Sequence, residues 1–238
     1  MNKQNTHYKN KLLDGLPSHE YEKLEPHLEQ VKLTSGVILY NPYDVIHYAY
    51  FPLSAMISLV KIMEDGSTTE IGLIGNEGMI GLPIILGGNY TTNNIVVQIS
   101  GESLKLRADI LKIEFSKGQT LQKLLLLYTQ ARLGQIAQTA ACNRHHKIEA
   151  RLARWLLSVY DCVRKDEFDL TQEFISHMLG VRRAGVTNAA HGLQEAGIIR
   201  YNRGKIVILD RQKLEQLSCE CHQAIQNEFM NLLDSTKQ

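Results

Sequence analysis

Residues 178–194 read MLGVRRAGVTNAAHGLQ, and this stretch decides the fold prediction. Gly180 interrupts a short apolar pattern, two arginines follow, and almost no bulky side chain precedes Leu193. A helix that begins near the arginines places its apolar side chains within about 100° of one another on one face, since successive residues turn by about 100°. The predicted inward face consists of Val186, Ala189, Ala190 and Leu193.

The opposite face of this predicted helix is lean and polar. It carries Ala184, Thr187, Asn188 and His191, with Arg183 on its edge. Small side chains allow close approach in a DNA major groove, where arginine pairs with guanine and asparagine with adenine. We therefore predict base contacts from Arg183, Thr187 and Asn188. We expect phosphate contacts from Arg182, which lies nearer the helix start, and from His191.

The flanking sequence predicts a winged helix-turn-helix. The preceding segment, LTQEFISHMLG, offers Thr171 as a helix N-cap and Gly180 for the tight turn. The following segment, IIRYNRGKIVIL, predicts a β-hairpin, the wing, with Arg203, Gly204 and Lys205 at its tip. Arg203 and Lys205 are the expected phosphate contacts of the wing. The alternative is a helical hairpin that has no role on DNA.

Charge and composition favour one anionic partner at one end of the chain. The net charge of the 238 residues is only +1, but residues 182–211 hold six basic and two acidic residues. Such a local patch indicates an anionic partner, although a solvated face would have the same composition. No apolar run approaches a membrane span, the N-terminus lacks a secretory signal, and four cysteines do not make a disulfide scaffold. We therefore predict a cytoplasmic protein.

Upstream of the helix-turn-helix the pattern changes twice. Residues 7–30 are amphipathic and predicted to be helical, and a helix restarts at Pro17 and Ser18. Residues 31–107 hold short β-branched runs separated by turn residues, which is typical of a small barrel or sandwich, and Asp65-Gly66 predicts a hairpin. The predicted class is α+β. The expected domains are a sensor domain (1–117), a dimerisation helix (118–143) and a DNA-binding domain (144–238).

The long segment 118–143 contains no proline and predicts one helix. Its first turns carry a large apolar stripe, and its later turns carry small side chains at helical spacing, which let two backbones approach closely. The alternative is a helix packed on the core of its own domain. The residues predicted to form the dimer interface are Leu121, Leu125, Tyr128, Ile136 and Ala140.

These segments resemble the Crp/Fnr family of bacterial transcription regulators. The resemblance is most specific over residues 170–210, extends back to about residue 128, and includes GNEGMIGLPIILGG at 75–88. It implies a cupin-like double-stranded β-roll sensor domain, a long dimer helix, and a C-terminal winged helix that binds palindromic DNA. It also implies RNA polymerase and an unknown small-molecule effector as partners, with no membrane involved.

The sequence departs from the best-known members of this family in the DNA-reading helix. Those members carry arginine and glutamate, then an arginine four residues after that glutamate. Arg183 matches the first position, but Ala184 and Asn188 occupy the other two. The consensus half-site of those members is therefore not expected for this chain.

The sensor domain also departs from the family pattern. The residues predicted to line an effector pocket are Gly81, Leu82, Thr92 and Asn93. The phosphate-binding arginine of cyclic-nucleotide-binding members is missing from NYTTNN at 89–94, so cyclic AMP is not expected. No cysteine precedes Cys142, which argues against the family's iron–sulfur cluster. His47 or His7 could serve as a haem ligand, but a lone histidine is more often a structural or surface residue. No cofactor is predicted, and the effector is unknown.

Two further patterns bear on metal or catalytic chemistry. CECH, residues 219–222, places Cys219, Cys221 and His222 close together, as in zinc or redox sites. Adjacency on a helix is the simpler interpretation, because a zinc site requires a further ligand and Cys142 and Cys162 are the only other thiols. No metal site is therefore predicted. Cupin enzymes bind metal through clustered histidines, but residues 31–107 hold a single histidine, so no enzyme activity is expected.

The sequence thus predicts a homodimeric, sequence-specific DNA-binding transcription regulator with a degenerate effector domain. The alternative is a ligand-sensing β-roll module whose winged helix serves as a scaffold for protein interactions.

Overall fold

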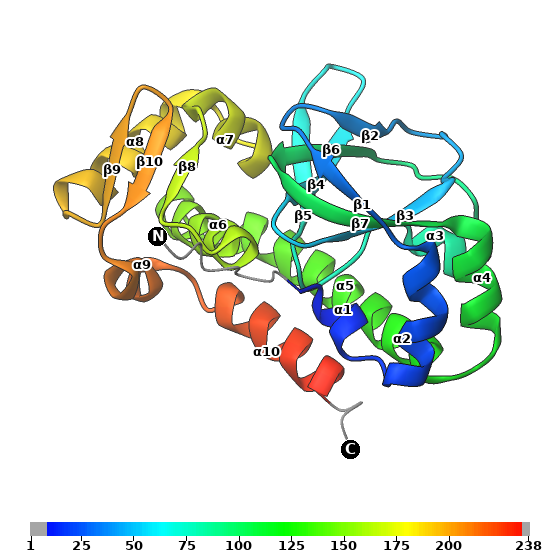
Figure 1. The fold of residues 1–238 in the computed structure, drawn as a ribbon. Helices are drawn as coiled ribbons and strands as arrows, with labels where there is room; N and C mark the ends of the chain where they lie inside the picture. The colour runs from blue at the N-terminus through cyan, green and yellow to red at the C-terminus, as the bar shows by residue number, and fades with distance from the viewer. Residues whose placement is uncertain (1–8, 235–238) are drawn as a thin grey trace, which may run out of the picture.

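The structure, a computed structural model, describes residues 9–234 as a β-rich half and a helical half joined by one long helix (Figure 1). The predicted α+β class is confirmed. The β-rich half contains, in order, α1 (Lys11–Asp14), α2 (Ser18–Leu24), the 3₁₀ turn η1 (Glu25–His27), β1 (Glu29–Leu33), β2 (Ile38–Tyr40), β3 (Tyr48–Pro52), β4 (Met56–Ile62), β5 (Thr68–Ile74), α3 (Leu82–Ile85), β6 (Asn94–Ile99), β7 (Gly101–Arg107) and α4 (Ala108–Ser116). The remaining elements are α5 (Thr120–His145), α6 (Ile148–Val163), β8 (Glu167–Asp169), α7 (Gln172–Leu179), α8 (Arg183–Glu195), β9 (Ile199–Asn202), β10 (Lys205–Ile208), α9 (Arg211–Leu217) and α10 (Cys221–Asp234).

The strands of the N-terminal half form two antiparallel sheets that enclose an apolar core. The orders are β1-β7-β3 and β2-β6-β4-β5. The predicted hairpin is confirmed: Gly66 takes a φ of +80°, and Asp65 Oδ1 accepts a hydrogen bond from the Ser67 amide at 2.9 Å. β1 begins two residues inside the region 7–30 that was expected to be helical, because its first residues, Glu29 and Gln30, are polar and exposed and give no strand signal. Residues 1–8, including His7, lie outside the described part.

The first half of α5 belongs to the core of the N-terminal domain. Leu121, Leu125 and Tyr128 are at most 4% exposed and pack into that core, so their assignment to a dimer interface is wrong. The physical reason is that the open side of the β-roll needs an apolar cover, which this stripe provides. The Tyr128 hydroxyl also exchanges hydrogen bonds of 3.1 Å with the backbone of Met79. Among the described helices, α5 included, none has the length and apolarity needed to cross a bilayer.

The helix-turn-helix forms as the sequence predicts. Thr171 caps α7 by accepting a hydrogen bond from the Phe174 amide at 3.1 Å. Gly180 ends α7 with a φ of +61°, and a Cβ there would lie 2.8 Å from Thr69 Oγ1 on β5. Glycine is therefore required twice at this turn, for its backbone conformation and for the close approach of β5.

The wing is the hairpin of β9 and β10, as predicted. Arg203 and Gly204 both have positive φ angles, of 48° and 84°, between the paired residues Asn202 and Lys205. Two consecutive positive φ angles define the type I′ turn that suits a two-residue hairpin. β8, which the sequence did not reveal, adds the third strand in the order β8-β10-β9.

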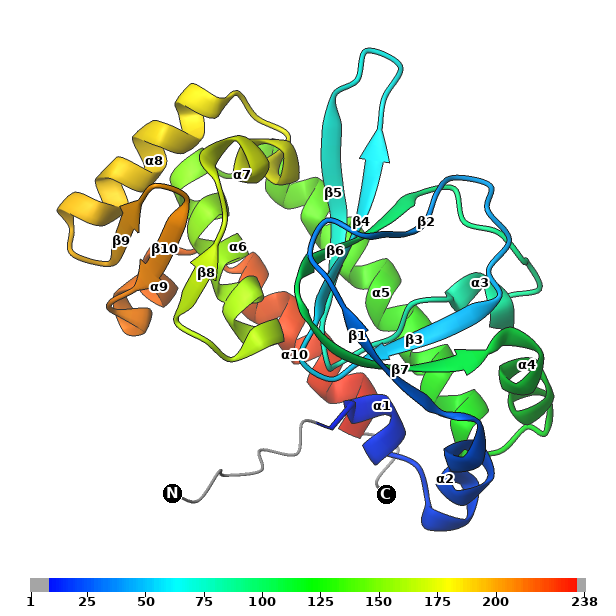
Figure 2. The same ribbon diagram turned by 45° about the horizontal axis from the view of Figure 1, so that its top comes forward.

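The two halves of the molecule share a continuous apolar interface. Met56, Val60 and Leu73 from β4 and β5 lie in the same core cluster as α6, α7 and α8. Figure 2 shows the β4–β5 hairpin standing beside α7. The last helix was expected to belong to the DNA-binding domain. Instead α10 lies along α5, and its Ile225 and Phe229 are buried in the N-terminal core (Figure 1).

Candidate nucleic-acid interface

The two faces of α8 are those that the sequence predicts. Its inward residues are 0–3% exposed: Val186, Ala189, Ala190 and Leu193. Its outward residues are exposed: Arg183, Ala184, Thr187, Asn188 and His191. The helix thus rests on its own domain through small apolar side chains and presents a polar face free of large hydrophobic groups. This surface has the composition that suits a major groove, and the individual DNA contacts stay predictions.

One further polar side chain lies beside the outward face and was missed from the sequence. The Thr187 hydroxyl lies 2.8 Å from Gln172 Oε1 and 3.1 Å from the Arg183 carbonyl oxygen. Gln172 is the first residue of α7. The sole sequence signal for its role was its position directly after the predicted N-cap, Thr171. Gln172 fixes the Thr187 hydroxyl and has donors of its own for a base or phosphate.

The cations of this interface differ in their present partners. Lys205 Nζ lies 2.5 Å from Glu167 Oε1, and this bonded carboxylate raises the pKa of Lys205. His191 Nδ1 lies 3.5 Å from Glu195 Oε2. Within residues 9–234 no ion pair involves the other three predicted cations: Arg182, Arg183 and Arg203. These three guanidinium groups are therefore the ones most available to an anionic partner.

A groove of about 350 Å³ brings two of these arginines together. It lies between the start of α7, the start of α8 and the wing, and is lined by Thr171, Gln172, Arg183, Tyr201, Arg203 and Gly204. Tyr201, also missed from the sequence, donates its hydroxyl to the Leu170 carbonyl at 2.9 Å, and burial raises its pKa. Arg203 at the wing side of this groove suits a phosphate of the DNA backbone, and Arg183 at its other side stays the predicted base contact.

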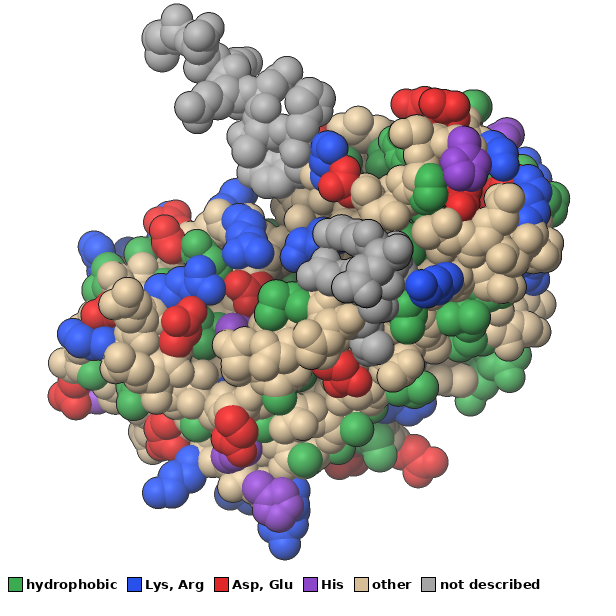
Figure 3. Space-filling model, turned by 90° about the horizontal axis from the view of Figure 1, so that it is seen from below, with side chains coloured by type: hydrophobic (Ala, Val, Ile, Leu, Met, Phe, Trp, Pro, Cys, Tyr) green, Lys and Arg blue, Asp and Glu red, His purple; other side chains and the backbone are tan. Residues whose placement is uncertain are grey.

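On the face seen from below, acidic and basic side chains are interspersed among the described residues (Figure 3). Such mixing is typical of a solvated surface.

The four residues predicted for an effector pocket do meet around one cavity. Gly81, Leu82, Thr92 and Asn93 line a space of about 400 Å³ inside the β-roll, which also has an apolar wall of Leu59, Met79 and Ile95. Gly81 has a φ of +114°, and a Cβ there would press on Ile84 and Ala49. His47 is exposed and does not line the cavity.

A buried cation reaches the same cavity from α5. Arg132 is 3% exposed and lines the cavity. Its Nη1 donates to the Leu73 carbonyl at 2.7 Å and also contacts Gln135, while its Nη2 has no hydrogen-bond partner within the described residues. The family resemblance implies a phosphate-binding arginine in segment 89–94. The sequence prediction therefore concerned a cation in that segment and did not consider Arg132. The missed signal was the place of Arg132 on the same helical face as the apolar residues Leu125 and Tyr128, seven and four positions before it.

A buried carboxyl group connects the β-roll to the DNA-binding domain. Glu70 Oε1 accepts a hydrogen bond from Trp155 Nε1 at 3.0 Å, and its Oε2 accepts one from the Ser58 hydroxyl at 2.7 Å. Burial raises the pKa of Glu70 to about 7, although these hydrogen bonds and two buried arginines, Arg154 and Arg132, favour the charged form. This contact between the two halves is therefore sensitive to pH near neutrality.

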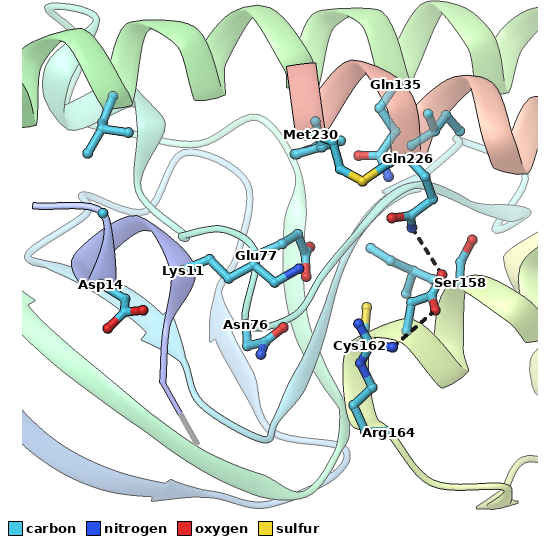
Figure 4. A pocket seen from close by; sticks show the side chains of 16 residues that line it. Lys11, Asp14, Asn76, Glu77, Gln135, Ser158, Cys162, Arg164, Gln226 and Met230 are labelled. Atoms are coloured by element: carbon cyan, nitrogen blue, oxygen red, sulfur yellow. Dashed lines mark hydrogen bonds and ion pairs between the residues drawn. The ribbon is translucent and has the colours of Figure 1, made fainter. Parts of the chain in front are cut away.

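A second cavity, of about 330 Å³, lies where α1, α5, α6 and α10 meet (Figure 4). Lys11 extends toward Glu77 at one side. At the other side Asp161, also in the lining, accepts a hydrogen bond from Gln226 at 3.0 Å and lies 3.7 Å from Arg164. The polar side chains named here are directed toward one another. We therefore interpret the cavity as a gap between packed helices and not as a ligand site.

Comparison with known proteins agrees with the architecture. Residues 150–217, which span α6 to α9, match the family model of the Crp-like helix-turn-helix domain. No curated protein matches the chain.

Several solved structures share the whole fold. FixK2 from Bradyrhizobium japonicum is 17% identical, with a TM-score of 0.68, over 81% of this chain and 98% of its own. A CRP/FNR family transcriptional regulator from Thermus thermophilus is 19% identical, with a TM-score of 0.65, over 80% and 98%. CLP from Xanthomonas campestris, described as a c-di-GMP responsive global regulator, is 13% identical, with a TM-score of 0.65, over 81% and 99%. At these identities the likeness concerns the fold.

Proposed function

We propose that this chain, a Crp/Fnr-type regulator fold with a Crp-like helix-turn-helix domain at residues 150–217, acts as a homodimer that binds a palindromic DNA site and regulates transcription. The observation that supports this most is the outward face of α8, where exposed Arg183, Thr187 and Asn188 stand above a fully buried apolar face. The proposed phosphate contacts are Arg182 and His191 of the recognition-helix region and Arg203 and Lys205 of the wing.

The proposed dimer interface is the exposed stripe of α5. Leu126 and Leu133 are 48% and 64% exposed, and Ile136 is 39% exposed. Positions 126, 133, 137 and 140 follow a heptad-like spacing and carry two leucines and then two alanines, which permits close packing of two helices. Ile136 and Ala140 thus keep their predicted role, and Leu126 and Leu133 replace the three buried residues. A second copy of α5 covers this stripe in the proposal.

The proposed function is tested by selecting sites from a random duplex DNA library with the purified protein at near-physiological salt. We expect a palindrome whose half-sites lie about one helical turn apart. Enrichment only in the presence of cell extract would identify an effector requirement. Salt-sensitive general binding without any enriched sequence would contradict the proposal and favour the protein-interaction scaffold.

The dimer is tested separately with Leu133→Asp. A charge in the centre of the stripe is expected to give a monomer by light scattering and to abolish binding to the palindrome at concentrations where the wild type binds. Leu217→Asp is the matched control, because Leu217 is 49% exposed on α9, outside the stripe. A dimer that persists in Leu133→Asp would refute this interface.

The proposed effector site is the β-roll cavity with Arg132. A buried guanidinium with one free nitrogen favours an acceptor or anionic group, and its origin on α5 connects the cavity to the proposed dimer helix. Cyclic AMP is not the proposed effector, because segment 89–94 holds no arginine. Thermal unfolding in the presence of inorganic phosphate, small carboxylates and cyclic AMP tests this. Stabilisation by cyclic AMP alone would refute it.

A further inference from the structure

The fold gathers three cysteines and one histidine at a point where α5, α9 and α10 converge. Cys142 lies in the last turn of α5, and His146 is the capping residue directly after the helix, where its backbone amide donates to the Cys142 carbonyl. Cys219 lies in the link after α9, and Cys221 is the first residue of α10. The four residues, which we name the Cys3His cluster, come from segments about 75 positions apart in the chain.

The donor atoms of the Cys3His cluster have the spacing of ligands around one ion. The four candidate ligand atoms all lie within 4.8 Å of one another. Cys142 Sγ lies 3.5 Å from Cys219 Sγ, and Cys221 Sγ lies 3.5 Å from His146 Nδ1. Tetrahedral zinc, with Zn–S of about 2.3 Å and Zn–N of about 2.0–2.1 Å, separates its ligand atoms by about 3.5–3.8 Å.

The surroundings hold these groups in orientations suited to metal binding. His146 turns Nδ1 toward Cys221, and its Nε2 lies 3.2 Å from Glu220 Oε2. A carboxylate on the second ring nitrogen fixes the tautomer of a metal-binding histidine. Gln138 Nε2 donates a hydrogen bond of 3.0 Å to Cys221 Sγ.

Burial separates these thiols from solvent. Cys142, Cys219 and Cys221 are at most 6% exposed and form a small cluster of their own, apart from the two large cores. Three sulfur donors and one imidazole select a soft or borderline cation over Mg²⁺ and Ca²⁺. Four protein ligands complete a tetrahedron, which is typical of a structural rather than a catalytic zinc site.

We propose that one zinc ion binds where α5 meets α10, held by Cys142, His146, Cys219 and Cys221. The ion joins the end of α5, directly before α6 of the DNA-binding domain, to the start of α10, whose Ile225 and Phe229 are anchored in the N-terminal core. It therefore fixes the connection through which the two halves of the molecule are held together. His222, the histidine of the CECH motif, is not a ligand, because its Nε2 lies 2.9 Å from Asp161 Oδ2.

The test measures metal content and coordination in the full-length protein. We expect one zinc per chain by elemental analysis after reconstitution with Zn²⁺ and desalting. We also expect cobalt substitution to give the thiolate charge-transfer and ligand-field bands of a tetrahedral site. Removal of the metal with a chelator should lower the thermal unfolding temperature, because binding to the native state stabilises it.

Variants separate the Cys3His cluster from the sequence motif. Cys221→Ser and His146→Ala are expected to lose stoichiometric zinc and the tetrahedral cobalt spectrum. Cys162→Ser and His222→Asn are the matched controls and should keep both, since Cys162 lies at the cavity of Figure 4 and His222 faces Asp161. Circular dichroism checks that each variant is folded. His146 has a partly exposed side chain, so His146→Ala keeps the test valid if a cysteine variant unfolds.

Three results would overturn the proposal. The first is wild-type protein that retains no zinc after reconstitution. The second is equal loss of zinc in His222→Asn and Cys221→Ser. The third is iron with inorganic sulfide in anaerobically purified protein, which would assign the same thiols to a cluster. None of these measurements depends on DNA binding, so failure of the zinc proposal and failure of the proposed function are distinguishable.

Discussion

Two groups of arginines in this molecule follow opposite rules. One group is exposed on α8 and the wing: Arg182, Arg183 and Arg203. The other is 3–7% exposed where the two halves meet: Arg132, Arg151 and Arg154. An exposed guanidinium stays hydrated and available to an outside partner, whereas a buried one must find its acceptors within the fold. The first group is therefore expected to determine DNA binding, and the second to determine how the halves are joined.

Two of the buried arginines bind carbonyl oxygens rather than forming ion pairs. Arg132 donates to the Leu73 carbonyl on β5, and Arg151 donates to the Leu179 carbonyl at the end of α7. The positive charges of Arg154 and Arg132 act on the buried acid Glu70, whose pKa burial nevertheless raises to about 7. Glu70 is therefore only partly ionised at neutral pH, which makes the junction sensitive to pH.

The largest expected effect comes from this carboxyl group. Its folded-state pKa of about 7 lies above the ordinary value of 4.5, so folding takes up a proton between these two values. Stability from Glu70 is therefore present at low pH and is lost as pH rises to about 7. At about 1.4 kcal/mol per pKa unit, the loss between pH 5 and 8 is about 2–3 kcal/mol.

Glu70→Gln removes this titration and keeps an acceptor for Trp155 Nε1. The stability of the wild type minus that of the variant, from urea unfolding at pH 5–8, is expected to fall by that amount. Parallel stability curves for the two proteins would show that Glu70 stays ionised when buried.

Arg151→Ala is expected to have the next largest effect on stability. Comparing it with a variant of an exposed arginine tests whether the two groups have different roles. It leaves the Leu179 carbonyl without its donor and opens a gap beneath α7, which costs about 2–3 kcal/mol of unfolding free energy. Arg182→Ala, at an exposed position, should change stability by less than about 0.5 kcal/mol. Urea unfolding of both variants at one pH measures the difference. Equal stabilities would mean that burial does not define the role of these arginines.

The parts of the interface that the sequence predicted are those set by local rules. The inward face of α8 follows from helical periodicity, and Thr171 and Gly180 act as caps whatever their distant neighbours are. The orientation of α5 does not follow in this way, because two leucine stripes run along it. The stripe with Leu125 faces the β-roll and the one with Leu133 faces outward. Which stripe is buried depends on how α5 packs against the β-roll, and the sequence of α5 does not show this.

The sites that the sequence missed depend on segments brought together by folding. Arg132 reaches the β-roll cavity only because α5 covers that domain. The Cys3His cluster requires α10 to lie along α5, and no pattern within CECH indicates that His146 rather than His222 faces the thiols. Spacing along the chain identifies a metal site when all of its ligands lie in one segment. Here Cys142 and His146 lie at the end of α5, whereas Cys219 and Cys221 lie about 75 residues later, next to α10.

Arg183→Ala tests the exposed group directly. Its loss is expected to weaken the selected palindrome by about 1–3 kcal/mol and to relax specificity at one base pair of each half-site. The unfolding free energy should not change, because the side chain is exposed and unpaired. Binding isotherms on the palindrome, on each single-base variant and on random DNA provide the measurement. Equal losses on specific and random DNA would reassign Arg183 to a phosphate.

The smallest expected effect concerns Lys205, the wing cation that already has a partner. Its ammonium group lies 2.5 Å from Glu167, and both side chains are about half exposed, at 51% and 54%. Glu167→Gln removes a negative charge that competes with DNA phosphate, so affinity for specific and random DNA should rise together by a few-fold. The salt dependence should steepen by up to about 0.9 in slope, the value of one further phosphate contact.

Glu215→Gln is the matched control, since Glu215 pairs with Arg211 on α9 and not with a wing cation. Titrations of both variants at several salt concentrations give the two slopes. A gain confined to the palindrome would show that Glu167 acts on a base contact, and an unchanged slope would remove Lys205 from the phosphate contacts. Either result would mean that free cations and internally paired cations occur side by side on the surface of α8 and the wing. The contrast would then not be one between this surface and the junction of the two halves.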